Sequence, residues 1–192
     1  TEKSWNILKE LKGKLRFILI GGWAVWLWTK SQKSKDIDII VDFGTLSELK
    51  KIYELRKNDK MRKYEIKTDD IDIDIYVAHY SQLAVSIEKI ETTKIEGFEV
   101  ANLEYLLALK QGAEWERKES EKGEKDRIDI MGMLLKCEIE FGKYRKLLKE
   151  NRKEVLLNRL VAIVKGFDDG SYFGLNQRQL KLAKQGILKK IE

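Results

Sequence analysis

The residues best suited to chemistry in this chain of 192 residues are two pairs of aspartates, each with one isoleucine between its members. Asp36 and Asp38 lie in the stretch KDIDIIVDF, and Asp72 and Asp74 lie in IDIDIYV. Side chains two residues apart in a strand point to the same face, so each pair places its carboxylates roughly 6 to 7 Å apart along that face. Two negative charges at this spacing repel each other unless water or a cation lies between them.

Carboxylate oxygens grouped in this way are ligands that Mg²⁺ or Mn²⁺ takes together with water and substrate phosphates. Two such ions can hold the attacking and leaving oxygens of a phosphoryl or nucleotidyl transfer. We therefore expect Asp36 and Asp38 to bind metal together with a third carboxylate from the second pair. Asp72 and Asp74 share one strand face, so the strand period does not choose between them. The alternative is that both stretches are only the solvent-facing sides of half-exposed strands.

A pair of glycines precedes the first aspartate pair. Gly21 and Gly22 stand between the apolar run LRFILI and the apolar stretch WAVWLWTK. Glycines at such a junction suit a turn from a strand into a helix, and the first amide N–H groups of a helix are exposed. Backbone without side chains and helix-start amides can together hold a triphosphate. The glycines therefore predict a phosphate site, with an ordinary turn as the simpler alternative.

The elements that position these residues follow from the spacing of the apolar side chains. We expect Ser4 to cap the first helix, and Thr45 or Ser47 to cap the third, with a hairpin turn near Asp69 and Asp70. The expected elements in chain order are a helix over 4–13, a strand over 15–20, a helix over 23–30, a strand over 35–43, a helix over 45–58, a hairpin over 64–79, short strands over 94–102, a helix over 103–115, and helices within 125–141, 142–167 and 176–192.

This order of elements predicts an α/β (α+β) fold in which a mixed sheet packs against helices and a helical part follows. We expect a core domain over residues 1–114 and a helical region over 115–192. The single cysteine, Cys137, excludes an internal disulfide, and no apolar stretch reaches the roughly 20 residues of a membrane span. We therefore expect a cytoplasmic protein without a membrane partner. The net charge of +6 is suited to an anionic partner such as RNA.

The order strand, Gly-Gly, helix, Asp-x-Asp strand, helix and Asp strand resembles the minimal nucleotidyltransferase signature of the DNA polymerase beta superfamily. The residues that match it are Gly21, Gly22, Asp36 and Asp38. The third carboxylate comes from Asp74 or Asp72, and family strands that read Asp followed by three apolar residues favour Asp74. The resemblance implies a nucleotidyltransferase-like sheet whose acidic groups hold two Mg²⁺ ions, position a nucleoside triphosphate such as ATP, and activate an acceptor hydroxyl.

The segment GGWAV, followed by Ser34 two residues before the first aspartate pair, is similar to AbiEii-like nucleotidyltransferases of the abortive-infection and toxin type, and also to lincosamide nucleotidyltransferases. The likeness covers roughly residues 15 to 135. Its later matches are Lys110, Arg117, Lys125, Asp126 and Asp129. The resemblance implies that Ser34 and Lys110 contact phosphate. One departure is Gln32, which stands where relatives often have arginine, and a nearby lysine does not reproduce the guanidinium fork.

Judged without the resemblance, the later matches have simpler explanations. Asp126 and Asp129 would lie in a helix N-terminal turn and on the surface, and Lys110 would extend its amine from an apolar helix to water. The five tryptophans would belong to the core, with stacking of Trp23 and Trp26 on a nucleobase as the less favoured alternative.

The resemblance implies a magnesium-dependent transfer of an NMP group from an NTP to an acceptor hydroxyl. The acceptor stays open among RNA, particularly a tRNA end, a small hydroxylated molecule and another protein, and the basic charge favours RNA. The resemblance also implies a toxin-like role and a separate antitoxin protein as a partner. One alternative is a relative that binds nucleotide or RNA without transfer. Another is a small-molecule nucleotidyltransferase of the antibiotic-modifying type, which would need an acidic acceptor pocket for a cationic drug, whereas this chain is basic.

Overall fold

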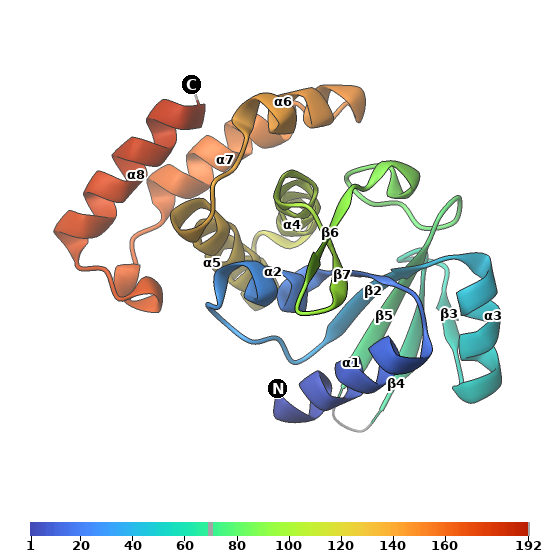
Figure 1. The fold of residues 1–192 in the computed structure, drawn as a ribbon. Helices are drawn as coiled ribbons and strands as arrows, with labels where there is room; N and C mark the ends of the chain where they lie inside the picture. The colour runs from blue at the N-terminus through green and yellow to red at the C-terminus, as the bar shows by residue number, and fades with distance from the viewer. Residues whose placement is uncertain (69–70, 192) are drawn as a thin grey trace. The chain divides into compact units, whose positions relative to one another are not determined.

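The computed structural model of the protein describes residues 1–68 and 71–191 and divides into two compact units, Thr1–Asn102 and Leu103–Glu192 (Figure 1). The sequence placed this boundary at residue 114, which falls inside the helix α4 (Leu103–Arg117). The whole of α4 belongs to the second unit because its apolar side chains pack against three other helices of that unit.

The first unit contains a mixed sheet with the strand order β3-β4-β5-β2-β1-β7-β6. Two neighbouring pairs, β1 with β7 and β2 with β5, are parallel, and the other pairs are antiparallel. The strands are β1 (Ile18–Ile20), β2 (Ile37–Val41), β3 (Arg56–Asn58), β4 (Lys63–Lys67), β5 (Asp72–Val77), β6 (Thr92–Ile95) and β7 (Phe98–Ala101). This mixed sheet with helices, followed by a helical part, confirms the predicted fold class.

The alternation of apolar and polar residues that predicted β2 and β5 is present in the structure. In β5 the isoleucines at 73 and 75 are buried, while Asp72 and Asp74, which alternate with them, are partly exposed. The predicted hairpin is confirmed, since β4 and β5 pair as antiparallel neighbours. Its predicted turn at Asp69 and Asp70 lies outside the described residues.

In the described part of the first unit, three α-helices and one 3₁₀ turn accompany the sheet. They are α1 (Glu2–Lys14), α2 (Gly21–Thr29), α3 (Phe43–Ile52) and η1 (Ile87–Lys89). The ring of Trp5 on α1 lies 4.9 Å from that of Trp23, 5.1 Å from that of Trp26 and 5.4 Å from that of Phe98. Such clustered aromatic rings bury large apolar areas. Trp23 is fully buried, so the core role predicted for it is confirmed.

Three local predictions in this unit are wrong. Ser4 does not cap α1 but lies inside it, where its hydroxyl donates to the carbonyl of Thr1. Asp42 caps α3 instead of Thr45 or Ser47, because its carboxylate accepts the N–H of Thr45 at 2.6 Å. The helix predicted to run to residue 58 ends at Ile52, because residues 56–58 form the edge strand β3 beside β4.

The second unit is helical in its described part (Figure 1). Its elements are α4, α5 (Glu121–Lys136), α6 (Phe141–Glu150), α7 (Val155–Gly166), the 3₁₀ turn η2 (Gly170–Phe173) and α8 (Gln177–Ile191). The carboxylate of Glu114 on α4 is fully buried and joins α4 to α5 and α7 through Arg127 and Arg159. Arg127 Nη1 lies 3.0 Å from Glu114 Oε1, and Arg159 Nε lies 2.9 Å from Oε2.

The ion pairs of Glu114 make the stability of this unit sensitive to acid. Burial acts to raise the pKa of Glu114, but Arg159 and Arg127 outweigh it and hold the pKa below its ordinary value of 4.5. The native state therefore binds fewer protons than the unfolded chain below that pH, and the stabilisation present above pH 4.5 is lost as the pH falls through the lowered pKa.

Glu114→Gln is expected to lower the free energy of unfolding by about 3 kcal/mol at neutral pH, because it leaves two guanidinium groups without their carboxylate. Thermal unfolding followed by circular dichroism from pH 7 to pH 3 measures this effect, and the difference from wild type should shrink as the pH falls below 4.5. The exposed residue Glu116 on the same helix provides the control Glu116→Gln, which should change little. A difference from wild type that is the same at every pH would contradict this assignment.

Candidate active site

The first contact in the site lies between Gly21 and Asp38. The register of β1 and β2 sets Ile20 opposite Asp38, so the chain turns into α2 directly beside this carboxylate. Gly21 has a φ of +68°, and a Cβ atom placed on it would lie 2.1 Å from Asp38 Oδ2. A side chain at this position is therefore excluded by backbone conformation and by space. The carboxylate of Asp38 therefore packs directly against the backbone of Gly21 at the start of α2.

Gly22 makes a similar contact with Ser34. A Cβ atom on Gly22 would lie 2.8 Å from the Oγ of Ser34. The loop before β2 is fixed there, because the Ser34 hydroxyl donates to the carbonyl of Asp36 at 2.9 Å and its carbonyl accepts from the Ser4 hydroxyl at 3.2 Å. The structure therefore places a hydroxyl beside the first turn of α2, which is where the resemblance placed a phosphate contact.

The second carboxylate comes from β5. Asp74 is directly opposite Asp38 in the parallel ladder of β2 and β5. Neighbouring strands lie about 4.8 Å apart, and directly opposed residues share a sheet face, so the two carboxylates are adjacent. Asp72 begins β5, one same-face position away, and is opposite Lys67 of β4. Asp36 precedes β2 and is partly exposed. The register thus distinguishes Asp74 from Asp72, which the strand period alone does not.

Two residues of β4, Lys63 and Glu65, lie on the same face of the sheet as Asp74, and the sequence analysis did not single them out. Glu65 is opposite Asp74, and Lys63 Nζ lies 2.6 Å from Asp74 Oδ2 and 3.2 Å from Glu65 Oε1. Burial raises the pKa of Asp74 above its ordinary value, although the Lys63 ammonium acts in the opposite direction. The pattern KYEIK does place Lys63 and Glu65 on one strand face. Their contact with Asp74 depends on the register of the hairpin.

The donor set suits a divalent cation that arrives with phosphates. Within residues 1–68 and 71–191, no three Asp, Glu, His or Cys side chains are grouped closely enough to hold a metal ion on their own. The predicted carboxylates Asp36, Asp38 and Asp74 therefore do not form a cage in this structure. Mg²⁺ usually takes only one or two protein carboxylates and completes its shell with water and substrate phosphate oxygens. The adjacent pair Asp38 and Asp74, beside a helix start, meets that requirement.

Four of the five later matches, all except Lys125, form an ion-pair network inside the second unit. Lys110 Nζ lies 2.6 Å from Asp129 Oδ2 and 3.2 Å from Asp126 Oδ1, and Arg117 makes two hydrogen bonds to Asp126. Asp126 is 1% exposed, so its expected place on the surface is wrong. Burial raises the pKa of Asp129, with Lys110 acting against this change. These contacts hold α4 and α5 together, and the phosphate contact of Lys110 stays a prediction.

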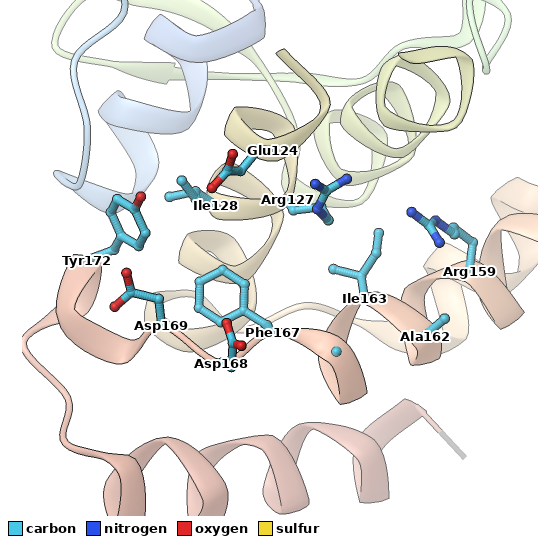
Figure 2. Close-up of a pocket in the computed structure, with 11 residues that line it drawn as sticks. Glu124, Arg127, Ile128, Arg159, Ala162, Ile163, Phe167, Asp168, Asp169 and Tyr172 are labelled. Carbon is cyan, nitrogen blue, oxygen red and sulfur yellow. The ribbon is translucent and has the colours of Figure 1, made fainter. Parts of the chain in front are cut away.

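The second unit also contains a hollow of about 460 Å³ between α5, α7 and the turn η2. Figure 2 shows that its lining residues include Arg127 and Arg159 on one side, with Glu124, Asp169 and Tyr172 on the other. Both arginines are paired with Glu114. The hollow contains none of the residues predicted to form the metal or phosphate site.

No helix in the described part of the chain is both long enough and apolar enough to cross a membrane.

The similarity of this chain to known proteins lies in its fold. No protein-family model and no curated protein matches it. Among solved structures it is similar to JHP933 from Helicobacter pylori, with 18% identity, a TM-score of 0.48, and coverage of 100% of this chain and 94% of that chain. It is also similar to ANT(2")-Ia in complex with adenylyl-2"-tobramycin, with 17% identity, a TM-score of 0.49, and coverage of 84% of this chain and 98% of that chain. A third similar structure is an antigenic nucleotidyltransferase-like protein from Paracoccidioides brasiliensis, with 17% identity, a TM-score of 0.45, and coverage of 88% of this chain and 94% of that chain. At such low identities and scores the chemistry of the site rests on the residues described above.

Proposed function

We propose that the protein transfers a nucleotidyl group from a nucleoside triphosphate to an acceptor hydroxyl, with Mg²⁺ or Mn²⁺ as the cofactor. The observation that supports this most strongly is the contact between the Gly21 backbone and the Asp38 carboxylate, with Asp74 directly opposite Asp38. It joins a helix start that can hold phosphates to a carboxylate pair that can hold their counter-ion.

The chain's own residues would act mainly by positioning. The exposed amides at the start of α2 and the Ser34 hydroxyl would bind the triphosphate, and Gly21 and Gly22 would let it approach the backbone. Asp38 and Asp74 would hold the metal, which, when bound, would neutralise charge on the reacting phosphate. Asp74 would also orient the acceptor hydroxyl. For phosphoryl chemistry, such positioning and charge stabilisation supply most of the rate enhancement.

The net charge of +6 supports RNA, including the end of a tRNA, as the acceptor in this proposal. The resemblance to AbiEii-like proteins extends it to a toxin-like role with an antitoxin protein as partner, and to phosphate binding by Lys110.

Transfer of label tests the proposed activity directly. Incubation with each nucleoside triphosphate, labelled at the α-phosphate, and total tRNA is expected to give labelled RNA only when Mg²⁺ or Mn²⁺ is present. Asp38→Asn should abolish the product, because it removes the charge beside Gly21 while keeping the shape of the side chain. Nucleotide binding by wild type without labelled product from any RNA or small hydroxylated acceptor would favour a binding protein over an enzyme.

A further inference from the structure

We propose that Lys63 is the resident counter-ion of Asp74: it pairs with this carboxylate while no divalent cation is bound, and moves to Glu65 when a cation arrives with a nucleoside triphosphate. This inference rests on the proposed function, since it gives Lys63 a positioning role in the same site. It predicts that the protein without nucleotide binds divalent cations only weakly.

The first support is the position of the ammonium group. Lys63 Nζ lies 2.6 Å from Asp74 Oδ2 and 3.2 Å from Glu65 Oε1, and the side chain of Lys63 is 12% exposed. One positive charge therefore serves two carboxylates on neighbouring strands. A divalent cation on Asp74 would repel this ammonium at close range, so the two compete for the same oxygen.

The second support is that Glu65 is held ready to accept the displaced charge. Its Oε1 accepts from the side-chain amide of Asn58 at 2.8 Å, and the residue is 9% exposed. Because Glu65 is already within ion-pairing distance, Lys63 can leave Asp74 without becoming a buried charge with no partner. Such a charge would be costly, so Glu65 makes the exchange possible.

The third support is the composition of the site. Among the described residues, no three potential ligands are grouped to hold an ion unaided. Triphosphate oxygens would supply the remaining ligands that outweigh the ion pair of Lys63. The cation and the nucleotide are therefore expected to bind together.

Titration with Mn²⁺ alone, followed by the electron paramagnetic resonance signal of the free ion, tests the first half of this proposal. Lys63→Met keeps the aliphatic stem but removes the competing charge, and is expected to raise the affinity for Mn²⁺ about tenfold. Lys67→Met is the matched control, since Lys67 lies on the same strand and face, is about half exposed, and is 3.7 Å from Glu65. Its affinity should stay within about twofold of wild type, because exposed charges are strongly screened.

An unchanged affinity in Lys63→Met, or an equal rise in both variants, would overturn the counter-ion role. Lys63→Gln provides a second variant should the methionine variant unfold, and circular dichroism establishes the folded state of each. The Mn²⁺ titrations of the Lys63 variants need no nucleotide. They therefore test the counter-ion role of Lys63 even if the protein has no transfer activity.

Glu65→Gln tests the second half. Without nucleotide its Mn²⁺ affinity should already be weaker than that of wild type, because a cation on Asp74 displaces Lys63 in that condition too. With a nucleoside triphosphate present it should be about tenfold weaker, because Lys63 then has no carboxylate to receive it. Wild-type affinity in both conditions would overturn the exchange. A wild-type protein whose Mn²⁺ affinity does not respond to any nucleotide would instead contradict the proposed function and, with it, the exchange, leaving the counter-ion result in place.

Discussion

Gly21→Ala is expected to lower the rate of nucleotidyl transfer by about 100-fold, because a misplacement of about 1 Å in a reacting group has an effect of this size. The added Cβ would lie 2.1 Å from Asp38 Oδ2, so this carboxylate must move away from the helix start. The substitution also forces alanine to a φ of +68°, which costs about 1 to 2 kcal/mol of unfolding free energy. Single-turnover kinetics at a temperature where the variant is folded separates the two effects.

Gly13→Ala is the matched control for this experiment. Gly13 lies in α1 of the same unit, and a Cβ atom on it would meet nothing within 4 Å. Alanine is the better helix former by about 1 kcal/mol, so the control should be as stable as wild type or more stable, with the same transfer rate. A Gly21→Ala variant that is destabilised but fully active would show that the contact with Asp38 serves only the fold.

Asp74→Asn is expected to lower the transfer rate by about 1000-fold, whereas Asp72→Asn should lower it by about tenfold or less. The reason is the register of the sheet, in which Asp74 and not Asp72 is directly opposite Asp38. Both substitutions remove one negative charge from the same face of the same strand, so each is the control of the other. Rates measured at saturating Mg²⁺ and nucleotide provide the comparison.

The reverse order of effects would assign the third carboxylate to Asp72. Equal small losses in both variants would mean that β5 contributes no carboxylate to catalysis. In either case Asp38 would need a different partner from the one that the register gives it.

The elements that contain Gly21, Asp38 and Asp74 could be predicted from the sequence because their signals are local. Gly21 has a backbone conformation that glycine adopts readily and other residues rarely do. The two-residue period of a strand puts the paired aspartates on one face. Apolar spacing likewise predicted most helices and the order of the elements. These features depend on residues that are neighbours along the chain.

The ion pair of Lys63 with Asp74 could not be predicted in the same way. It depends on which residues of β4 and β5 are opposite each other, and a shift of one position would move Lys63 to the other face. The burial of Asp126 was missed for a similar reason. Its partners Lys110 and Arg117 lie on another helix, and helical spacing alone does not show which faces of two helices meet.

The most direct test of the proposed site is calorimetric titration of the four nucleoside triphosphates, with and without Mg²⁺, into the wild type and the double variant Asp36→Ala/Asp38→Ala. The site predicts binding to the wild type that requires Mg²⁺ and is lost in the double variant, with one base preferred over the others. Binding that is the same in both proteins, or no binding to the wild type with any nucleotide, would contradict it. The aspartates would then be only the solvent-facing side of two strands.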